Sequence, residues 1–317
     1  MTGPGLDSEQ FDPGVADDER LDRAEPLLLQ RLYLLSENQH WQVRALNFER
    51  DRADWAALGD EQRAMLVNSM APFFAGEERV AAVLAPIILA ADDEHELAFL
   101  ATQQADEARH MQFFDRFWRE VLDSHGSAIG SAVLDARARC NDAFTELFDR
   151  RLMQALTRLR LNPRDGDAKL EAVTIYHLVV EATMGLTGMH FLLDYFVKHS
   201  LFPGITAGLR NVERDEHRHV AYGTWFLRQK CREQDRHGFL VSSTMMELLP
   251  VAASVIIEGG QGVCDGLDPV KFLDYASAEV NHFALVGLSR RLKVIGGATD
   301  EIQRFVASGA WRAARFL

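Results

Sequence analysis

The chain has 317 residues, of which 47% are hydrophobic, and a formal net charge of -13. This length and apolar content suffice for a large buried core, while the acidic excess argues against nucleic-acid partners, which require clustered Lys and Arg. No uninterrupted apolar run reaches the ~18 residues of a membrane span, and three cysteines without a C-x-x-C pair fit a reducing compartment. We therefore expect a cytoplasmic protein without a membrane span.

The elements expected along the chain are helical. Residues 1–25 are rich in Asp, Glu, Gly and Pro and lack the basic start and apolar centre of a signal peptide, so they predict a disordered acidic leader. Helical periods without a competing strand pattern then predict one all-α domain over 26–295 and a helical tail over 296–317. The expected helices run from about 26–38, 60–91 with kinks at Pro72 and Pro86, 93–123 with Asp92 or Asp93 as N-cap, 134–161, 168–201, 205–234, 238–258 and 269–292.

Two short segments repeat one chemical pattern. Residues 106–110 read DEARH and residues 215–219 read DEHRH, so each places a Glu three positions before a His. On a helix, both side chains leave the same face about one turn apart and can reach a common point. Two such elements, with one further Glu from each of two other helices, form the ligand set of dimetal carboxylate proteins with a ferritin-like four-helix bundle.

Two isolated glutamates supply the missing pair. Glu77 interrupts the apolar stripe of the helix expected at 60–91, and Glu181 is the only acid between Glu171 and Asp194. A charged group that faces a core costs several kcal/mol unless it is paired or binds a metal. One E-x-x-H element alone would more often be an exposed helix face, but the combination favours a metal site. The candidate ligands are Glu77, Glu107, His110, Glu181, Glu216 and His219.

The order and spacing of these motifs resemble the metal-carrying small subunit of class I ribonucleotide reductase and its relatives. The resemblance rests on AGEE at 75–78, EARH at 107–110, VEA at 180–182 followed by LTG at 186–188, and DEHRHVAYG at 215–223. It extends from about Trp41 to Tyr275. The resemblance implies a ferritin-like four-helix bundle core with additional helices, the six metal ligands above, a homodimer, and an electron route through Trp41, His110 and Asp215.

Within that superfamily the chain looks most like the ligand-binding oxidases. A standard reductase subunit places its radical-bearing Tyr four residues after the first ligand His, where this chain has Phe114. The oxidases instead carry a Val and a Tyr that oxidation joins as an ether, and the corresponding residues here are Val80 and Tyr176. Because Tyr176 lies ~140° round an ideal helix from Glu181, only a local distortion such as a π-bulge would bring the two together.

His177 departs from the oxidase pattern. It precedes Glu181 by four residues and should therefore share its helix face. It could be a seventh metal ligand, but we favour a supporting role in which it is hydrogen-bonded to a carboxylate.

The resemblance thus implies an oxidoreductase that uses dioxygen to oxidise C–H bonds in two-electron steps. Four carboxylates and two imidazoles suit hard, redox-active metals, so the expected cofactor is a Mn/Fe or Fe/Fe pair, supplied with electrons by an unspecified donor. The expected ligand is apolar and fatty-acid-like. An alternative is the radical-generating small subunit of a ribonucleotide reductase without the radical tyrosine, and a third is a non-enzymatic metal-storage bundle.

Overall fold

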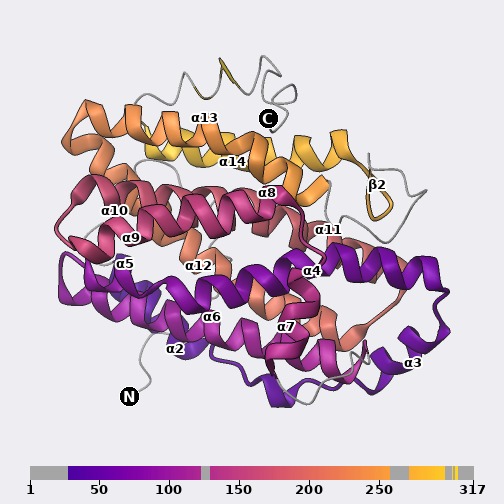
Figure 1. Ribbon diagram of the computed structural model, residues 1–317. Coiled ribbons are helices and arrows are strands. Elements are labelled where there is room, and N and C mark those ends of the chain that lie inside the picture. The colour runs from indigo at the N-terminus through magenta and orange to yellow at the C-terminus, as the bar shows by residue number, and fades with distance from the viewer. Residues whose placement is uncertain (1–27, 123–128, 258–270, 297–301, 303, 306–317) are drawn as a thin grey trace, which may run out of the picture.

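Long helices stacked in layers make up the fold (Figure 1). The structure is a computed structural model that describes residues 28–122, 129–257, 271–296, 302 and 304–305. The leader expected at 1–25 and most of the expected tail lie outside the described residues. The elements are α2 (Leu28–Asn38), η2 (Val43–Ala45), α3 (Glu49–Ala57), α4 (Asp60–Val83), α5 (Ala85–Leu89), α6 (Glu94–Glu120), α7 (Ile129–Arg137), α8 (Asp142–Phe144), η3 (Thr145–Leu152), α9 (Met153–Leu161), α10 (Gly166–Val173), η4 (Thr174–Gly185), α11 (Leu186–His199), α12 (Pro203–Glu233), α13 (Asp235–Ile257), β1 (Lys271–Phe272), β2 (Tyr275–Ala276) and α14 (Ser277–Ile295).

Four of these elements, α4, α6, η4 and α12, carry the candidate ligands. α4 packs along α6, and α12 packs along η4. α13 and α14 form an outer layer on η4 and α12, seen in orange and yellow in Figure 1. The expected all-α class is confirmed, because the described residues contain only one two-stranded antiparallel ladder, between β1 and β2.

Several helix boundaries follow from capping groups that the sequence indicates. Asp93 is the N-cap of α6, and its carboxylate accepts hydrogen bonds from the backbone N–H groups of His95 and Glu96, each at 2.9 Å. Asp165 caps α10 in the same way through Ala168. Pro203 begins α12, where its missing N–H has no helical partner to lose.

Two predicted helices are interrupted in the structure, and a third begins later than expected. The helix expected over 60–91 is divided into α4 and α5, since Pro86 cannot donate the backbone hydrogen bond that would continue it. The helix expected over 134–161 is broken before α8, where the Asn141 side chain accepts from the Phe144 N–H and starts a new helix. The helix expected over 269–292 begins only at Ser277, because β1 and β2 precede it.

α3 lies in a stretch for which the sequence predicted no helix, and it holds the start of α12. Asp51 of α3 accepts hydrogen bonds from the backbone N–H groups of Gly204 at 2.8 Å and Ile205 at 2.7 Å. A Cβ atom on Gly204 would lie 2.3 Å from the Asn47 carbonyl oxygen, so only glycine allows this approach. The buried carboxylate thereby satisfies N–H groups that a helix end leaves without intrahelical partners.

By length and composition alone, Asp235–Ile256 of α13 could cross a membrane. In this fold 56% of its most apolar window is buried, and α13 packs against η4, α12 and α10. A long apolar helix in the core of a protein has the same composition. The apolar residues of α13 are therefore accounted for by its packing on η4, α12 and α10.

Candidate metal centre

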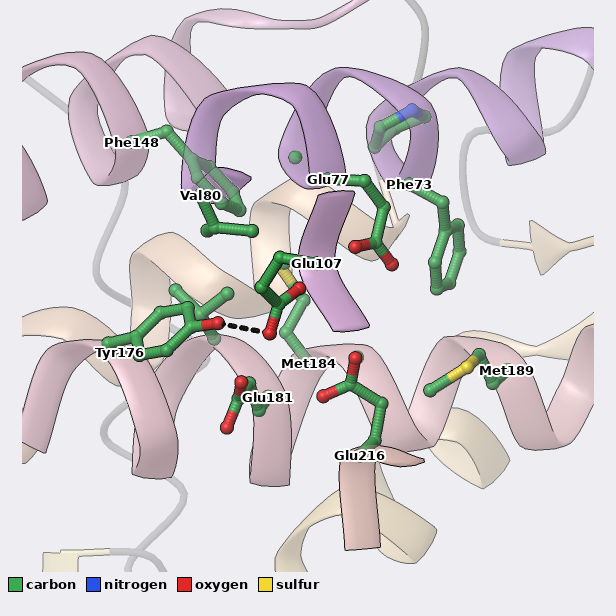
Figure 2. Close-up of a pocket in the computed structure, with 14 residues that line it drawn as sticks. Phe73, Glu77, Val80, Glu107, Phe148, Tyr176, Glu181, Met184, Met189 and Glu216 are labelled. Carbon is green, nitrogen blue, oxygen red and sulfur yellow. Dashed lines mark hydrogen bonds between the residues drawn. The ribbon is translucent and has the colours of Figure 1, made fainter. Parts of the chain in front are cut away.

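The six candidate ligands converge inside the bundle. Figure 2 shows the four carboxylates of the cluster approaching one another from different helices. The ligand atoms form two groups, and all atoms of a group lie within 4.8 Å of one another. Each group contains one imidazole, and Glu107 and Glu216 belong to both. This is the arrangement expected for two neighbouring metal sites bridged by two carboxylates. The groups are Glu77, Glu107, His110 and Glu216, and Glu107, Glu181, Glu216 and His219.

The inward-facing atoms of this cluster lack hydrogen-bond partners. The Nδ1 atoms of His110 and His219 are buried without a hydrogen bond, as is one carboxylate oxygen each of Glu107, Glu181 and Glu216. Buried polar atoms are normally paired, because an unpaired one loses its hydration without compensation. Five such atoms directed at one region therefore fit a site built for cations.

The Nε2 atom of each ligand imidazole contacts the aspartate of the other motif. His110 Nε2 lies 3.2 Å from Asp215 Oδ2, and His219 Nε2 lies 3.3 Å from Asp106 Oδ2. A carboxylate at Nε2 keeps the proton on that nitrogen and leaves Nδ1 free to bind a metal. The two motifs are therefore reciprocal, because α6 orients the imidazole of α12 and α12 orients that of α6.

Two arginines neutralise this pair of aspartates. Arg218 donates to Asp106 and to Asp215, each at 2.8 Å, and Arg109 donates to Asp106 at 2.7 Å and to Asp215 at 3.3 Å. Both aspartates are buried, so their charges need these partners. Sequence reasoning singled out Asp215 but missed Asp106 and the arginines. The signal was present, since both segments read D-E-x-R-H and all four specified positions belong to the centre.

Protons occupy much of the cluster when no metal is bound. Burial raises the pKa of the Glu77 carboxyl to about 8 and the pKa of Glu181 well above its ordinary value. Burial also disfavours the charged forms of Glu107 and the two imidazoles. The contacts between these imidazoles and the surrounding carboxylates outweigh the effect of burial. They lower the pKa of Glu107 and raise the pKa values of His110 and His219. A metal must therefore displace protons from several of its ligands.

Metal loading is expected to release protons, and to release fewer of them above pH 8 than below it. Glu77 must ionise to bind a metal, and it has already done so above its pKa of about 8. Titration calorimetry in two buffers of different ionisation heat measures the number released. Glu77→Gln should abolish the difference across pH 8, and an unchanged difference in that variant would contradict the assignment. Because the folded pKa exceeds the ordinary 4.5, this group makes the metal-free fold less stable as pH rises from 4.5 through 8.

Asp106→Asn and Asp215→Asn are each expected to weaken metal binding about 10- to 100-fold, the usual effect of losing a carboxylate behind a ligand imidazole. The amide keeps the size of the side chain but removes the charge that holds the Nε2 proton. Asp115→Asn is the matched control, because Asp115 is equally buried on α6 but pairs with Arg119. Competition with a coloured chelator measures the affinities. Equal losses in all three variants would show a general structural effect and refute the role.

An apolar cavity opens beside the carboxylates (Figure 2). About 400 Å³ of space in and at the mouth of this cavity is not filled by atoms, and part of that space is open to solvent. Glu77, Glu107, Glu181 and Glu216 line its polar end, so a molecule in the cavity would have one end at the metal ligands. Its apolar walls include Phe73, Val80, Phe148, Val180, Met184 and Met189.

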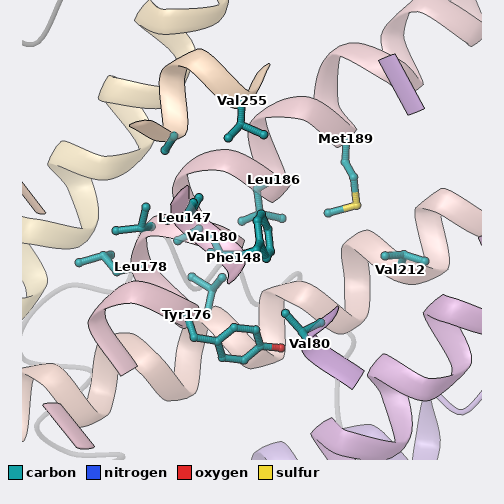
Figure 3. Packing of buried hydrophobic residues seen from close by; sticks show 14 of the residues in the cluster. Val80, Leu147, Phe148, Tyr176, Leu178, Val180, Leu186, Met189, Val212 and Val255 are labelled. Atoms are coloured by element: carbon teal, nitrogen blue, oxygen red, sulfur yellow. The ribbon is translucent and has the colours of Figure 1, made fainter. Parts of the chain in front are cut away.

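The π-helical geometry of η4 brings Tyr176 to this cavity. A π-helix pairs residues five apart, so Tyr176 and Glu181 stand about one turn from each other and not on diverging faces. The Tyr176 hydroxyl donates to Glu107 Oε1 at 2.6 Å, and Gln103 Nε2 donates to Tyr176 at 3.3 Å and Glu181 at 3.1 Å. The local distortion expected from the sequence is thus present. Figure 3 shows the Tyr176 hydroxyl directed toward Val80, and both residues line the cavity.

His177 contacts Gln103, whose amide in turn donates to the ligand Glu181. Its Nε2 is 3.2 Å from the amide oxygen of Gln103, so its partner is an amide and not the expected carboxylate. It belongs to neither ligand group. Burial lowers the pKa of His177 to about 3, which keeps the ring neutral. A Cβ on Gly223 would lie 2.2 Å from the His177 Cβ, so this glycine of α12 makes room for the ring.

Phe114 and Trp41, which the sequence suggested as residues near the centre, are both buried. Phe114 is buried and stacks on Phe73 and Phe74, with both pairs of ring centres 6.4 Å apart. The Trp41 indole N–H donates to Asp215 Oδ2 at 2.7 Å, and this carboxylate contacts His110. A continuous line of hydrogen bonds therefore runs from Trp41 to a ligand.

Comparisons with known proteins agree with this geometry. The family model described as ribonucleotide reductase, small chain, matches residues 28–296. A solved R2-like ligand-binding oxidase variant with an anaerobically reconstituted Mn/Fe cofactor is 25% identical, with a TM-score of 0.70 over 84% of this chain and 93% of that one. The same variant with an aerobically reconstituted Mn/Fe cofactor is 24% identical, with a TM-score of 0.73 over 84% of this chain and 97% of that one.

Proposed function

Because this chain belongs to the ribonucleotide reductase small-chain family, we propose that it is a dioxygen-activating dimetal oxidase that oxidises C–H bonds in two-electron steps. The observation that carries the proposal is the buried cluster of four carboxylates and two imidazoles, open to an apolar cavity. The ligands would be the six side chains predicted from the sequence. Their oxygen and nitrogen atoms suit Mn and Fe, and the similar solved oxidases carry a Mn/Fe cofactor.

A bound Mn/Fe or Fe/Fe pair supplies the electrons that activate dioxygen and then accepts electrons from a C–H bond. The protein contributes the rest. Glu107 and Glu216, which belong to both ligand groups, would bind both ions, and the Asp106 and Asp215 carboxylates keep a proton on Nε2 of each imidazole. The apolar walls exclude water and hold an apolar, fatty-acid-like ligand with one end at the carboxylates. Trp41 and Asp215 would provide a path for electrons to the ligand His110.

Two side chains that line the same cavity could themselves be oxidised. Val80 and Tyr176 line it together, and the Tyr176 hydroxyl donates to the ligand Glu107. We infer that oxidation joins the Tyr176 oxygen to the Val80 β-carbon. The Tyr176 O–H bond and the Val80 C–H bond break, one C–O bond forms, and two protons leave. The two electrons would go to the oxidised metal pair when it is bound.

The alternative, a ribonucleotide reductase subunit without its radical tyrosine, shares the cluster but has no use for the cavity. Phe114 fits both functions, since neither uses a tyrosyl radical at that position, but an apolar cavity lined by Val80 and Tyr176 favours the oxidase. A metal-storage bundle would need no apolar cavity at the ligands. We also propose a cytoplasmic homodimer, as family resemblance suggests. Light scattering should then give twice the chain mass of 35.7 kDa, and a monomeric mass at micromolar concentration would exclude the dimer.

The direct test is to load the reduced protein with Mn and Fe, or Fe alone, without air and then add dioxygen. The oxidase should take up dioxygen in proportion to its metal pairs and without a partner subunit. A storage bundle would continue to accumulate iron beyond two ions per chain. Failure of the two-metal protein to consume dioxygen would reject the proposal.

A further inference from the structure

A second buried polar cluster lies beyond His177 and has no part in metal binding. The Tyr222 hydroxyl of α12 donates to Glu96 Oε1 of α6 at 2.5 Å. Lys169 Nζ of α10 lies 2.9 Å from both carboxylate oxygens of Glu96. All three residues are at most 3% exposed. Because a buried ion pair contributes little net stability compared with apolar packing, this cluster suggests a chemical role.

Tyr222 is connected inward to the metal centre. Its ring centre lies 5.0 Å from that of His177, and the His177 ring centre lies 4.6 Å from that of Tyr176. The Tyr176 hydroxyl in turn donates to the ligand Glu107. Aromatic rings and hydrogen bonds thus form an unbroken series from a metal ligand to Tyr222.

Tyr222 is also connected outward. Its ring centre lies 6.2 Å from that of Trp225, which is partly exposed. Lys169 continues to Asp92, at 3.3 Å, and the Asp92 side chain is 60% exposed. One branch therefore offers an oxidisable ring near the surface, and the other offers polar groups through which a proton can equilibrate with solvent.

We propose that Tyr222 is a redox-active tyrosine that gives one electron to the oxidised metal centre and its phenolic proton to Glu96. The step rests on the proposed function, which supplies the oxidant. The Tyr222 O–H bond breaks, an O–H bond forms on the Glu96 carboxylate, and the metal pair is reduced by one electron. A one-electron reductant in solution, of the ascorbate or reduced-flavin class, restores the tyrosine through Trp225, and Glu96 returns the proton.

The surroundings of Tyr222 favour this coupled transfer. A phenol that loses an electron becomes a very strong acid, so it needs a base already in hydrogen-bond contact, and Glu96 is placed at that distance. Burial raises the pKa of Tyr222 well above its ordinary value, so the phenol keeps its proton until it is oxidised. Lys169 contacts both oxygens of the Glu96 carboxylate and has Asp92 as a second acidic partner at 3.3 Å.

Tyr275 provides a matched control within the same chain. It is also a buried tyrosine whose hydroxyl donates to a carboxylate, that of Asp194. Its ring packs on Phe191 of α11 and does not belong to the series that reaches Glu107. A general effect of removing a tyrosine hydroxyl bonded to an acid would therefore appear in both Tyr222→Phe and Tyr275→Phe.

The experiment mixes the reduced, metal-loaded full chain with dioxygen, freezes it within milliseconds to seconds, and records electron paramagnetic resonance spectra. The expected result is a tyrosyl signal that changes shape with ring-deuterated tyrosine, disappears in Tyr222→Phe and persists in Tyr275→Phe. Glu96→Gln should also lose it, since the amide still accepts the hydrogen bond but cannot hold the proton. Metal content and circular dichroism verify that the variants fold and bind metal.

A metal centre that becomes oxidised, as followed by its visible absorption, without a tyrosyl signal in the unmodified protein would overturn the proposal. So would a signal that survives in Tyr222→Phe. Both results leave the proposed oxidase intact. If the absorption does not change and no dioxygen is consumed, the oxidase proposal fails, and the role of Tyr222 fails with it.

Discussion

Glu181→Ala is expected to reduce the metal content from two ions per chain to one while leaving the helices in place. Glu181 belongs to only one of the two ligand groups, and one of its buried oxygens has no hydrogen-bond partner. Its removal therefore leaves the other group complete. Elemental analysis of the protein after metal loading, together with far-ultraviolet circular dichroism, measures both quantities.

Two further variants sharpen this result. Glu107→Ala should lose both ions, because Glu107 contributes to both groups. Glu78→Ala should keep both, since Glu78 adjoins Glu77 in sequence but forms an ion pair with Arg137 at 3.1 Å. Two full equivalents of metal in Glu181→Ala would show that the centre is not built from these six side chains.

The second large effect that we expect is a covalent bond between Val80 and Tyr176. After metal loading and exposure to air, the chain is expected to lose two hydrogens and to yield one linked pair of peptides containing Val80 and Tyr176. Val80 stands on the cavity-facing side of α4, one turn beyond Glu77, and its β-carbon carries a tertiary C–H bond, which is weaker than the neighbouring methyl C–H bonds. The π-helical turn of η4 places the Tyr176 hydroxyl in the same cavity.

Peptide mass mapping decides this prediction. Tyr176→Phe should retain two metal ions but show no linkage, whereas Tyr195→Phe, which removes a hydroxyl on α11 away from the cavity lining, should link normally. The metal-free chain treated with air is the second control. Unlinked Val80 and Tyr176 peptides from a fully metallated, air-exposed sample would reject the reaction.

The reciprocal Asp–His contacts bear on both results. Because each motif orients the imidazole of the other, neither half of the centre is correctly arranged without α6 and α12 in register. We therefore expect metal binding and the packing of these two helices to be strongly coupled, as when a site is fully formed only in the folded protein.

The sequence alone was sufficient for the all-α class and for the candidate ligands. A Glu and a His three positions apart must share a helix face, and a lone acid such as Glu181 in an apolar run must find a partner. Local signals also placed helix boundaries, as at Asp93 and Pro203, because capping and proline geometry depend on a few adjacent residues.

What only the tertiary structure decided depends on contacts between distant segments. The pairing of Asp106 with His219, more than a hundred residues away, follows from the packing of α6 against α12. The repeated D-E-x-R-H pattern marks both residues but not which residue each of them contacts. The π-helical turn that brings Tyr176 to Glu107 is a choice among helical hydrogen-bond patterns that neighbouring helices stabilise. The contact between Glu96 and Tyr222 is likewise set by helix packing, because helical spacing determines which side chains share a face but not which face meets another.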